Sequence, residues 1–87
     1  EAEQLASLTK TIVMALVDKP DNVCVTHTAG EYAVVLEIRV CAGDVGKVIG
    51  RQGIYANAMR VLLSAVAGKL RKSVTMVVIC PHLDRNG

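Results

Sequence analysis

Apolar residues recur along this chain at two spacings, one typical of helices and one typical of strands. Near the N-terminus they follow the helical spacing of three or four residues. The positions concerned are Leu5, Leu8, Ile12 and Leu16. This pattern predicts a first helix over about residues 3–18. We expect the helix to end before Pro20, because proline disfavours helical backbone in the residue that precedes it.

Two strand-like segments follow, separated by a tight connection at residues 29–31. The first runs from Val23 to Thr28 and is rich in β-branched residues. The second runs from Tyr32 to Val40 and alternates in polarity. Its predicted inner face consists of Val34, Leu36, Ile38 and Val40. The two segments therefore predict a hairpin whose second strand is half-buried.

The second half of the chain predicts two helices and a last strand. A short helix begins at Asp44, a residue suited to the N-cap, and ends at a turn over residues 50–53. A longer helix spans about Ile54 to Ala67, and an apolar strand spans Val74 to Cys80. The order is therefore αββααβ. The helices between the last two strands suit a parallel pair, which cannot be joined by a short hairpin.

Length and composition indicate one small domain with more apolar residues than its own core requires. The chain has 87 residues, of which 52% are hydrophobic and 21% charged. We assign residues 1–80 to a single domain and residues 81–87 to a polar tail that we expect to be flexible. So high an apolar content favours a second buried surface, such as a subunit interface. Because the chain begins at Glu1, we expect its natural start to be missing or processed.

Charge is small overall but unevenly placed. The formal net charge is +2, so a nucleic-acid site would have to be local. Residues 47–72 hold a run of cations with no acid between them. These cations are Lys47, Arg51, Arg60, Lys69, Arg71 and Lys72. One side of the molecule is therefore expected to be positive, although most single lysines are ordinary solvated surface.

Cysteine and histidine do not predict a metal site or a catalytic centre. Cys24, Cys41 and Cys80 form no close pair, and no signal peptide is recognisable, so we expect free thiols in the cytoplasm. Cys24 and His27 would point to opposite faces of a strand, and so could not readily share a zinc ion. We find no paired carboxylates and no run long enough to cross a bilayer. The chain is therefore expected to be neither an enzyme nor a membrane-spanning protein, and to hold no cofactor.

The turn between the two later helices carries the most specific chemistry. Gly50 and Gly53 allow close backbone approach, because neither has a Cβ. The turn precedes a helix N-terminus, where unpaired amides and the helix dipole attract anions. Lys47 and Arg51 add positive charge beside it. Together these features predict a phosphate seat. The simpler alternative to a phosphate site is a plain helix–helix connector, in which the two glycines only allow the chain to turn.

The residues G-K-V-I-G-R-Q-G, from Gly46 to Gly53, resemble the KH domain signature V-I-G-x-x-G. In spacing and residue type, Leu5 to Ile79 resembles the small bacterial single-KH proteins of the KhpA (YlqC) family. The resemblance implies an α+β, type II KH-like fold with three helices on one face of a three-stranded mixed sheet. It also implies a loop that clamps the backbone of about four nucleotides. Ala56 stands where KH domains often carry a larger aliphatic residue, which implies a roomier groove or a shifted helix.

The resemblance implies that the chain binds single-stranded RNA as a post-transcriptional regulator or RNA chaperone. It also implies a homodimer, or a complex with a larger KH-type partner of the Jag (KhpB) kind. The predicted RNA-binding residues are Lys47, Gly50, Arg51, Gln52 and Gly53, with Val45 and Ile49 lining an aliphatic groove. Ile38, Val40 and Val48 are further groove candidates, for which a place in the core is at least as well supported. Tyr32 and Tyr55 are the only aromatic residues, which disfavours aromatic base-stacking platforms of the RRM or OB-fold type.

The longer helix has two apolar faces and only a narrow polar stripe. One face consists of Ala56, Met59, Leu63 and Val66, and the KH resemblance implies that it is the core face. The other, predicted to be a dimer interface, consists of Ile54, Ala58, Val61, Leu62 and Ala65. The alternative is a core contact broad enough to bury both faces. An interface here also leaves open a different function, that of a protein-interaction adaptor with a vestigial KH loop.

Overall fold

The structure, a computed structural model, describes residues 2–79. Within that range the helices are α1 (Ala2–Leu16), α2 (Val45–Ile49) and α3 (Ile54–Lys69), and the strands are β1 (Cys24–Ala29), β2 (Ala33–Arg39) and β3 (Ser73–Ile79). Short 3-10 segments lie at Pro20–Asn22, Ala42–Asp44 and Arg51–Gly53. The predicted order αββααβ is confirmed. Cys80 and the predicted tail, residues 81–87, lie outside the described residues.

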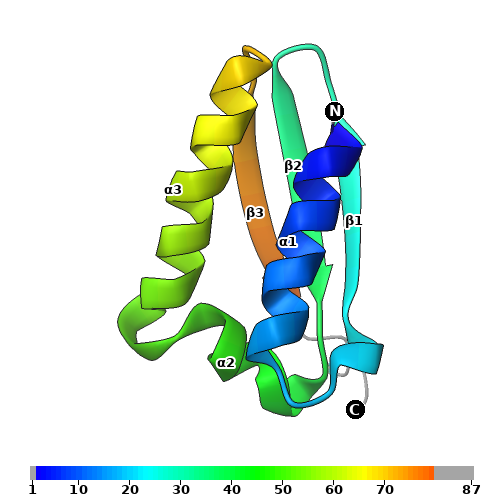
Figure 1. Cartoon of the computed structure of the whole chain (residues 1–87), viewed down its shortest axis with the longest axis vertical. Helices are drawn as coiled ribbons and strands as arrows, with labels where there is room; N and C mark the ends of the chain where they lie inside the picture. The colour runs from blue at the N-terminus through cyan, green and yellow to red at the C-terminus, as the bar shows by residue number, and fades with distance from the viewer. Residues whose placement is uncertain (1, 80–87) are drawn as a thin grey trace.

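The strands form one mixed sheet in the order β1-β2-β3. Strand β2 is antiparallel to β1, with Val25 opposite Ile38, and parallel to β3, with Leu36 beside Met76. The helices lie on one face of this sheet, where α1 crosses β1 and β2 while α3 runs beside β3 (Figure 1). The α+β class and the mixed sheet are therefore as predicted.

The core lies between β2 and the two long helices. The predicted inner face of β2 is confirmed, since Val34, Leu36 and Ile38 have no exposed surface and Val40 is 1% exposed. The strict alternation of polarity predicts this face, because successive side chains of a strand point to opposite sides. The other apolar residues with no exposed surface are Leu5, Val13, Val48, Leu63 and Ala67.

The buried face of α1 does not consist only of the apolar residues whose spacing predicted the helix. Leu5 is buried, but Leu8 is 42% exposed, and Thr9 and Val13 take the central positions. Thr9 lies in the core because its hydroxyl donates a hydrogen bond of 2.7 Å to the carbonyl of Leu5, one turn earlier. The polar side chain is thereby satisfied without water, which the apolar pattern could not indicate.

Helix α3 has one buried and one exposed apolar face. Met59 and Leu63 are buried and Ala56 and Val66 are half-buried, as expected of the core face. The helix continues two residues beyond the predicted end, because Gly68 lies within it. The second face is left in solvent, with Ile54, Val61 and Leu62 exposed by 60%, 65% and 59%, and with Ala58 and Ala65 also exposed. A core contact that buries both faces is therefore wrong for the single chain.

Candidate nucleic-acid interface

The turn that joins α2 to α3 forms the lower left corner of the molecule in Figure 1. It combines three left-handed residues, with φ of 80° at Gly50, 58° at Gln52 and 77° at Gly53. The amide of Gly50 closes α2 by donating to the carbonyl of Gly46 at 2.8 Å, and the amide of Gly53 donates to Gly50 at 3.1 Å. The turn is thus a defined bend rather than a loose connection.

Gly50 is required by its surroundings as well as by its backbone. A Cβ at this position would lie 2.6 Å from Cδ2 of Tyr55 and 3.0 Å from the backbone nitrogen of Tyr55. The ring of Tyr55 therefore occupies the space that any side chain at residue 50 would need. Gly53 has open space around it, so only its positive φ favours glycine there.

The N-terminus of α3 is left without an internal acceptor. Gly53 occupies the N-cap and has no side chain that could accept a hydrogen bond. Arg51 and Gln52 are exposed residues, and within residues 2–79 their backbone amides donate no hydrogen bond. Unpaired donors and the positive end of the helix dipole therefore face solvent at one place, an arrangement suited to an anion.

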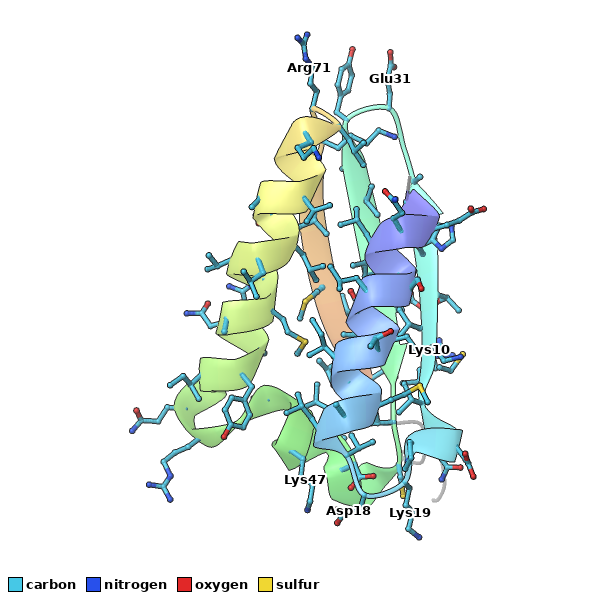
Figure 2. The ribbon with its side chains drawn as sticks, viewed as in Figure 1. Lys10, Asp18, Lys19, Glu31, Lys47 and Arg71 are labelled. Carbon is cyan, nitrogen blue, oxygen red and sulfur yellow. The ribbon has the colours of Figure 1, made fainter. Side chains whose placement is uncertain are left out.

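The two predicted cations of the site differ in their surroundings. Arg51 is exposed, and no carboxylate of the described chain lies within 4.0 Å of it. The ammonium of Lys47 lies 3.5 Å from a carboxylate oxygen of Asp18, and Figure 2 shows both side chains at the same end of the molecule. The charge of Lys47 is therefore partly offset by Asp18, whereas the charge of Arg51 is not offset by a carboxylate of the described chain.

Asp44 plays a part that differs from the predicted one. It stands at the N-cap of α2, but its side chain makes no capping hydrogen bond there. Instead the carboxylate, 4% exposed, accepts hydrogen bonds from the amides of Asp18 at 3.3 Å and Lys19 at 3.0 Å. Asp44 therefore occupies the predicted N-cap position, but its side chain accepts from amides 26 and 25 residues away rather than from α2. This anchor ties α2, and hence the turn, to the segment that follows α1.

The aliphatic residues near the turn divide into core and surface. Ile38 and Val48 are fully buried and Val40 nearly so, which excludes them as groove residues in this structure. Val45 and Ile49 are half-buried, so part of each side chain can touch a ligand. No enclosed pocket is formed by residues 2–79. The site is thus an open surface, which suits an extended polymer.

Other chemistry receives no support from this part of the chain. Across residues 2–79 there is no cluster of three histidine, cysteine or acidic residues that could hold a metal ion. The described helices include none that is both long enough and apolar enough to cross a membrane. Cys24 and Cys41 are free thiols.

Comparison with known proteins gives a consistent result. A family profile described as KhpA/KhpB, KH domain, matches residues 6–79. A protein named RNA-binding protein KhpA from Caldanaerobacter subterraneus subsp. tengcongensis is 44% identical over 75 residues, covering 86% of this chain and all of that protein. The protein of the same name from Clostridium acetobutylicum is 43% identical over 75 residues, with the same coverage. The one from Treponema pallidum is 54% identical over 56 residues, covering 64% of this chain and 70% of that protein. No solved structure matches the chain.

Proposed function

The chain belongs to the KhpA/KhpB KH-domain family, and from this premise we propose that it binds single-stranded RNA through the Gly50–Gly53 turn. Its relatives are named RNA-binding proteins. The observation that carries the proposal is the open N-terminus of α3, where the free amides of Arg51 and Gln52 meet the unpaired Arg51 side chain. The amides hold a backbone phosphate and Arg51 neutralises it, while Gly53, which has open space around it, keeps the approach clear.

Single strands fit this surface better than duplexes. A KH turn clamps about four nucleotides, and its bases must be unpaired to reach aliphatic side chains. Val45 and Ile49 are the half-buried residues available for that contact, and Lys47 adds charge once it exchanges its bond to Asp18 for a phosphate. Few cations are involved, so binding is weak and sensitive to salt. We propose no catalytic step, and we place the protein in the cytoplasm as an RNA chaperone or post-transcriptional regulator.

The exposed apolar face of α3 supports a second part of the proposal, which is association. Ile54, Val61 and Leu62 present three large aliphatic side chains to water. Burying one such side chain is worth about 1.5–3 kcal/mol. In a symmetric dimer both subunits offer the same patch, so each residue is buried twice. We therefore propose a homodimer through this face, with a larger KH-type protein of the KhpB kind as the alternative partner.

Reversing charge at the turn tests the RNA site. We expect the double substitution Arg51→Asp with Gln52→Asp to abolish binding to a short single-stranded RNA and to leave the fold intact, because both side chains are exposed. The matched control is Arg71→Asp with Lys69→Gln, which removes the same three units of positive charge at the other end of α3. Fluorescence anisotropy reports affinity, and circular dichroism reports folding.

The outcomes separate the proposal from its rival. Loss of binding in the turn variant, but not in the control variant, supports the clamp. Equal RNA affinity in the turn variant and the wild type rejects it. If binding to protein partners also survives in that variant, the adaptor function with a vestigial loop becomes the better account.

Association is tested by light scattering on the wild type and on Leu62→Glu. We expect a dimer and a monomer respectively, because a buried, unpaired carboxylate is strongly unfavourable at an apolar interface. The matched control is Leu8→Glu, which alters another exposed leucine, on α1, and should remain dimeric. A wild type that is monomeric at high micromolar concentration contradicts the proposal, as does a dimeric Leu62→Glu.

A further inference from the structure

Tyr55 lies directly against the backbone of the turn. A Cβ at Gly50 would come within 2.6 Å of Cδ2 and 2.7 Å of Cγ of Tyr55, so the ring fills the side-chain position of residue 50. The ring therefore contacts the residue next to Arg51, whose amide is free. Its position is fixed by the turn on one side and by the first turn of α3, from which it arises, on the other.

Half of this aromatic side chain remains in solvent. Tyr55 is 49% exposed, and its hydroxyl makes no hydrogen bond among residues 2–79. Packing against Gly50 requires an apolar surface but not an aromatic one. An aliphatic residue would serve that purpose equally well. The exposed ring is therefore unexplained by the fold alone.

We propose that the ring of Tyr55 stacks on a nucleobase of the nucleotide whose phosphate is held at the turn. This inference rests on the proposed function and names a contact that the turn residues do not supply. A base-stacking ring beside free backbone amides lets one nucleotide be held at two points, its phosphate and its base. The ring is held in place before RNA arrives, so little side-chain freedom is lost on binding. A single tyrosine at a helix end differs from the aromatic sheet platforms that the composition disfavours.

The chain offers an unusually clean optical test. It contains two tyrosines and no tryptophan, so tyrosine is its only strong fluorophore. Tyr32 is 74% exposed and follows Glu31, which Figure 2 shows at the end of the molecule opposite Lys47. The variant Tyr32→Phe therefore leaves Tyr55 as the only emitter, and Tyr55→Phe leaves only Tyr32. Stacking on a nucleobase quenches tyrosine emission.

The probe is a fluorescently labelled hexa-adenylate for anisotropy and the same unlabelled oligonucleotide for tyrosine emission. We expect Tyr32→Phe to lose tyrosine emission in parallel with the binding curve. We expect Tyr55→Phe to bind with affinity within about twofold of the wild type, since a phenyl ring also stacks, and to show only the loss due to light absorbed by the RNA. We expect Tyr55→Leu, which keeps the apolar cover over Gly50, to bind about five- to tenfold more weakly.

The results separate this inference from the proposed function. If Tyr32→Phe binds the oligonucleotide with unchanged Tyr55 emission, stacking is overturned while the clamp stands. If Tyr55→Leu binds as tightly as the wild type, stacking is again overturned. If the oligonucleotide fails to bind Tyr32→Phe, or binds equally to the Arg51→Asp, Gln52→Asp variant, the proposed site is wrong and this inference is overturned with it.

Discussion

The two ends of α3 use the same backbone conformation for opposite purposes. At the N-terminal end Gln52 has a φ of 58°, and at the C-terminal end Arg71 has a φ of 59°. After the C-terminal end the chain folds back on itself. Arg71 donates its amide to Gly68 at 3.1 Å and Lys72 donates to Ala67 at 3.1 Å. At the N-terminal end the amides of Arg51 and Gln52 remain free. One left-handed turn thus closes a helix, while the other opens a helix to an external acceptor.

Charge alone would favour the C-terminal end of α3 as the RNA site, in contrast to the proposed one. Lys69, Arg71 and Lys72 lie at the C-terminal end, and Arg51 stands alone at the N-terminal end of the helix. Cations near a helix C-terminus stabilise the helix itself, because they oppose the negative end of the dipole. Arg51 has the unfavourable location, beside the positive end and without an acidic partner in the described chain. The comparison supports the proposal that Arg51 serves a ligand, whereas the C-terminal cations have a structural explanation.

The largest effect should come from adding a methyl group at the N-terminal turn. An alanine Cβ at residue 50 would collide with Tyr55, and the alanine backbone would have to adopt a φ of 80°. Gly50→Ala should therefore lower the free energy of unfolding by about 3 kcal/mol. Gly53→Ala has open space, and it should cost only about 1 kcal/mol, for its left-handed backbone. Urea denaturation of the two variants measures the difference. Equal costs would contradict the packing role assigned to Tyr55.

The anchor of the N-terminal end should have the next largest effect. Asp44→Ala leaves the amides of Asp18 and Lys19 without their acceptor, which should lower the free energy of unfolding by about 1–3 kcal/mol. Asp44→Asn keeps one acceptor oxygen and should lose less. Thermal unfolding ranks the two variants. An alanine variant as stable as the wild type would show that this anchor does not hold α2.

A salt titration should distinguish Arg51 from Arg71. For single strands, each neutralised phosphate contributes about −0.7 to the slope of log affinity against log salt concentration. If two or three phosphates are neutralised, we expect a slope of about −1.5 to −2. Arg51→Gln should weaken RNA binding and make the slope shallower by about 0.7, the contribution of one phosphate. Arg71→Gln should leave the slope unchanged. If Arg71→Gln has the larger effect, RNA binds at the C-terminal end and the comparison is reversed.

The smallest effect is expected at the C-terminal turn. Arg71→Gly removes a Cβ from a left-handed residue, which relieves about 1–2 kcal/mol of strain, although the added chain freedom of glycine offsets part of this gain. The net stabilisation should be about 0.5–1 kcal/mol. RNA affinity should not change, because the structure gives Arg71 no part in the turn site. Denaturant midpoints and anisotropy measure the two quantities. A clear loss of affinity would assign Arg71 to the RNA surface.

The sequence predicted the order of the elements and the buried face of β2, because periodicity and strand alternation are local properties. It also placed the turn, since its glycines and the helix after it are adjacent along the chain. It did not predict which face of α1 is central, because Thr9 is made compatible with the core by a hydrogen bond that polarity does not reveal. Local pattern is therefore sufficient for the framework of this fold.

Partners distant in sequence account for what the sequence did not reveal at the site. Asp44 has the sequence of an N-cap, but its donors come from the segment that follows α1. Lys47 was predicted to add positive charge beside the turn, and the sequence did not indicate that it pairs with Asp18. Tyr55 gave a weaker signal. A single aromatic residue just after a G-x-x-G turn could have been flagged, but only the structure shows its ring against Gly50.

The most direct test of the central claim is an NMR titration of the uniformly ¹⁵N-labelled protein with a short, unstructured single-stranded RNA. Helix α3 has 16 residues and is about 24 Å long, which exceeds the screening length of about 8 Å at physiological salt. A ligand at one end should therefore leave the other end largely unperturbed. We predict the largest amide shift changes at residues 50–55, led by the free amides of Arg51 and Gln52. Changes centred on residues 70–73, with residues 50–55 unmoved, would contradict the account.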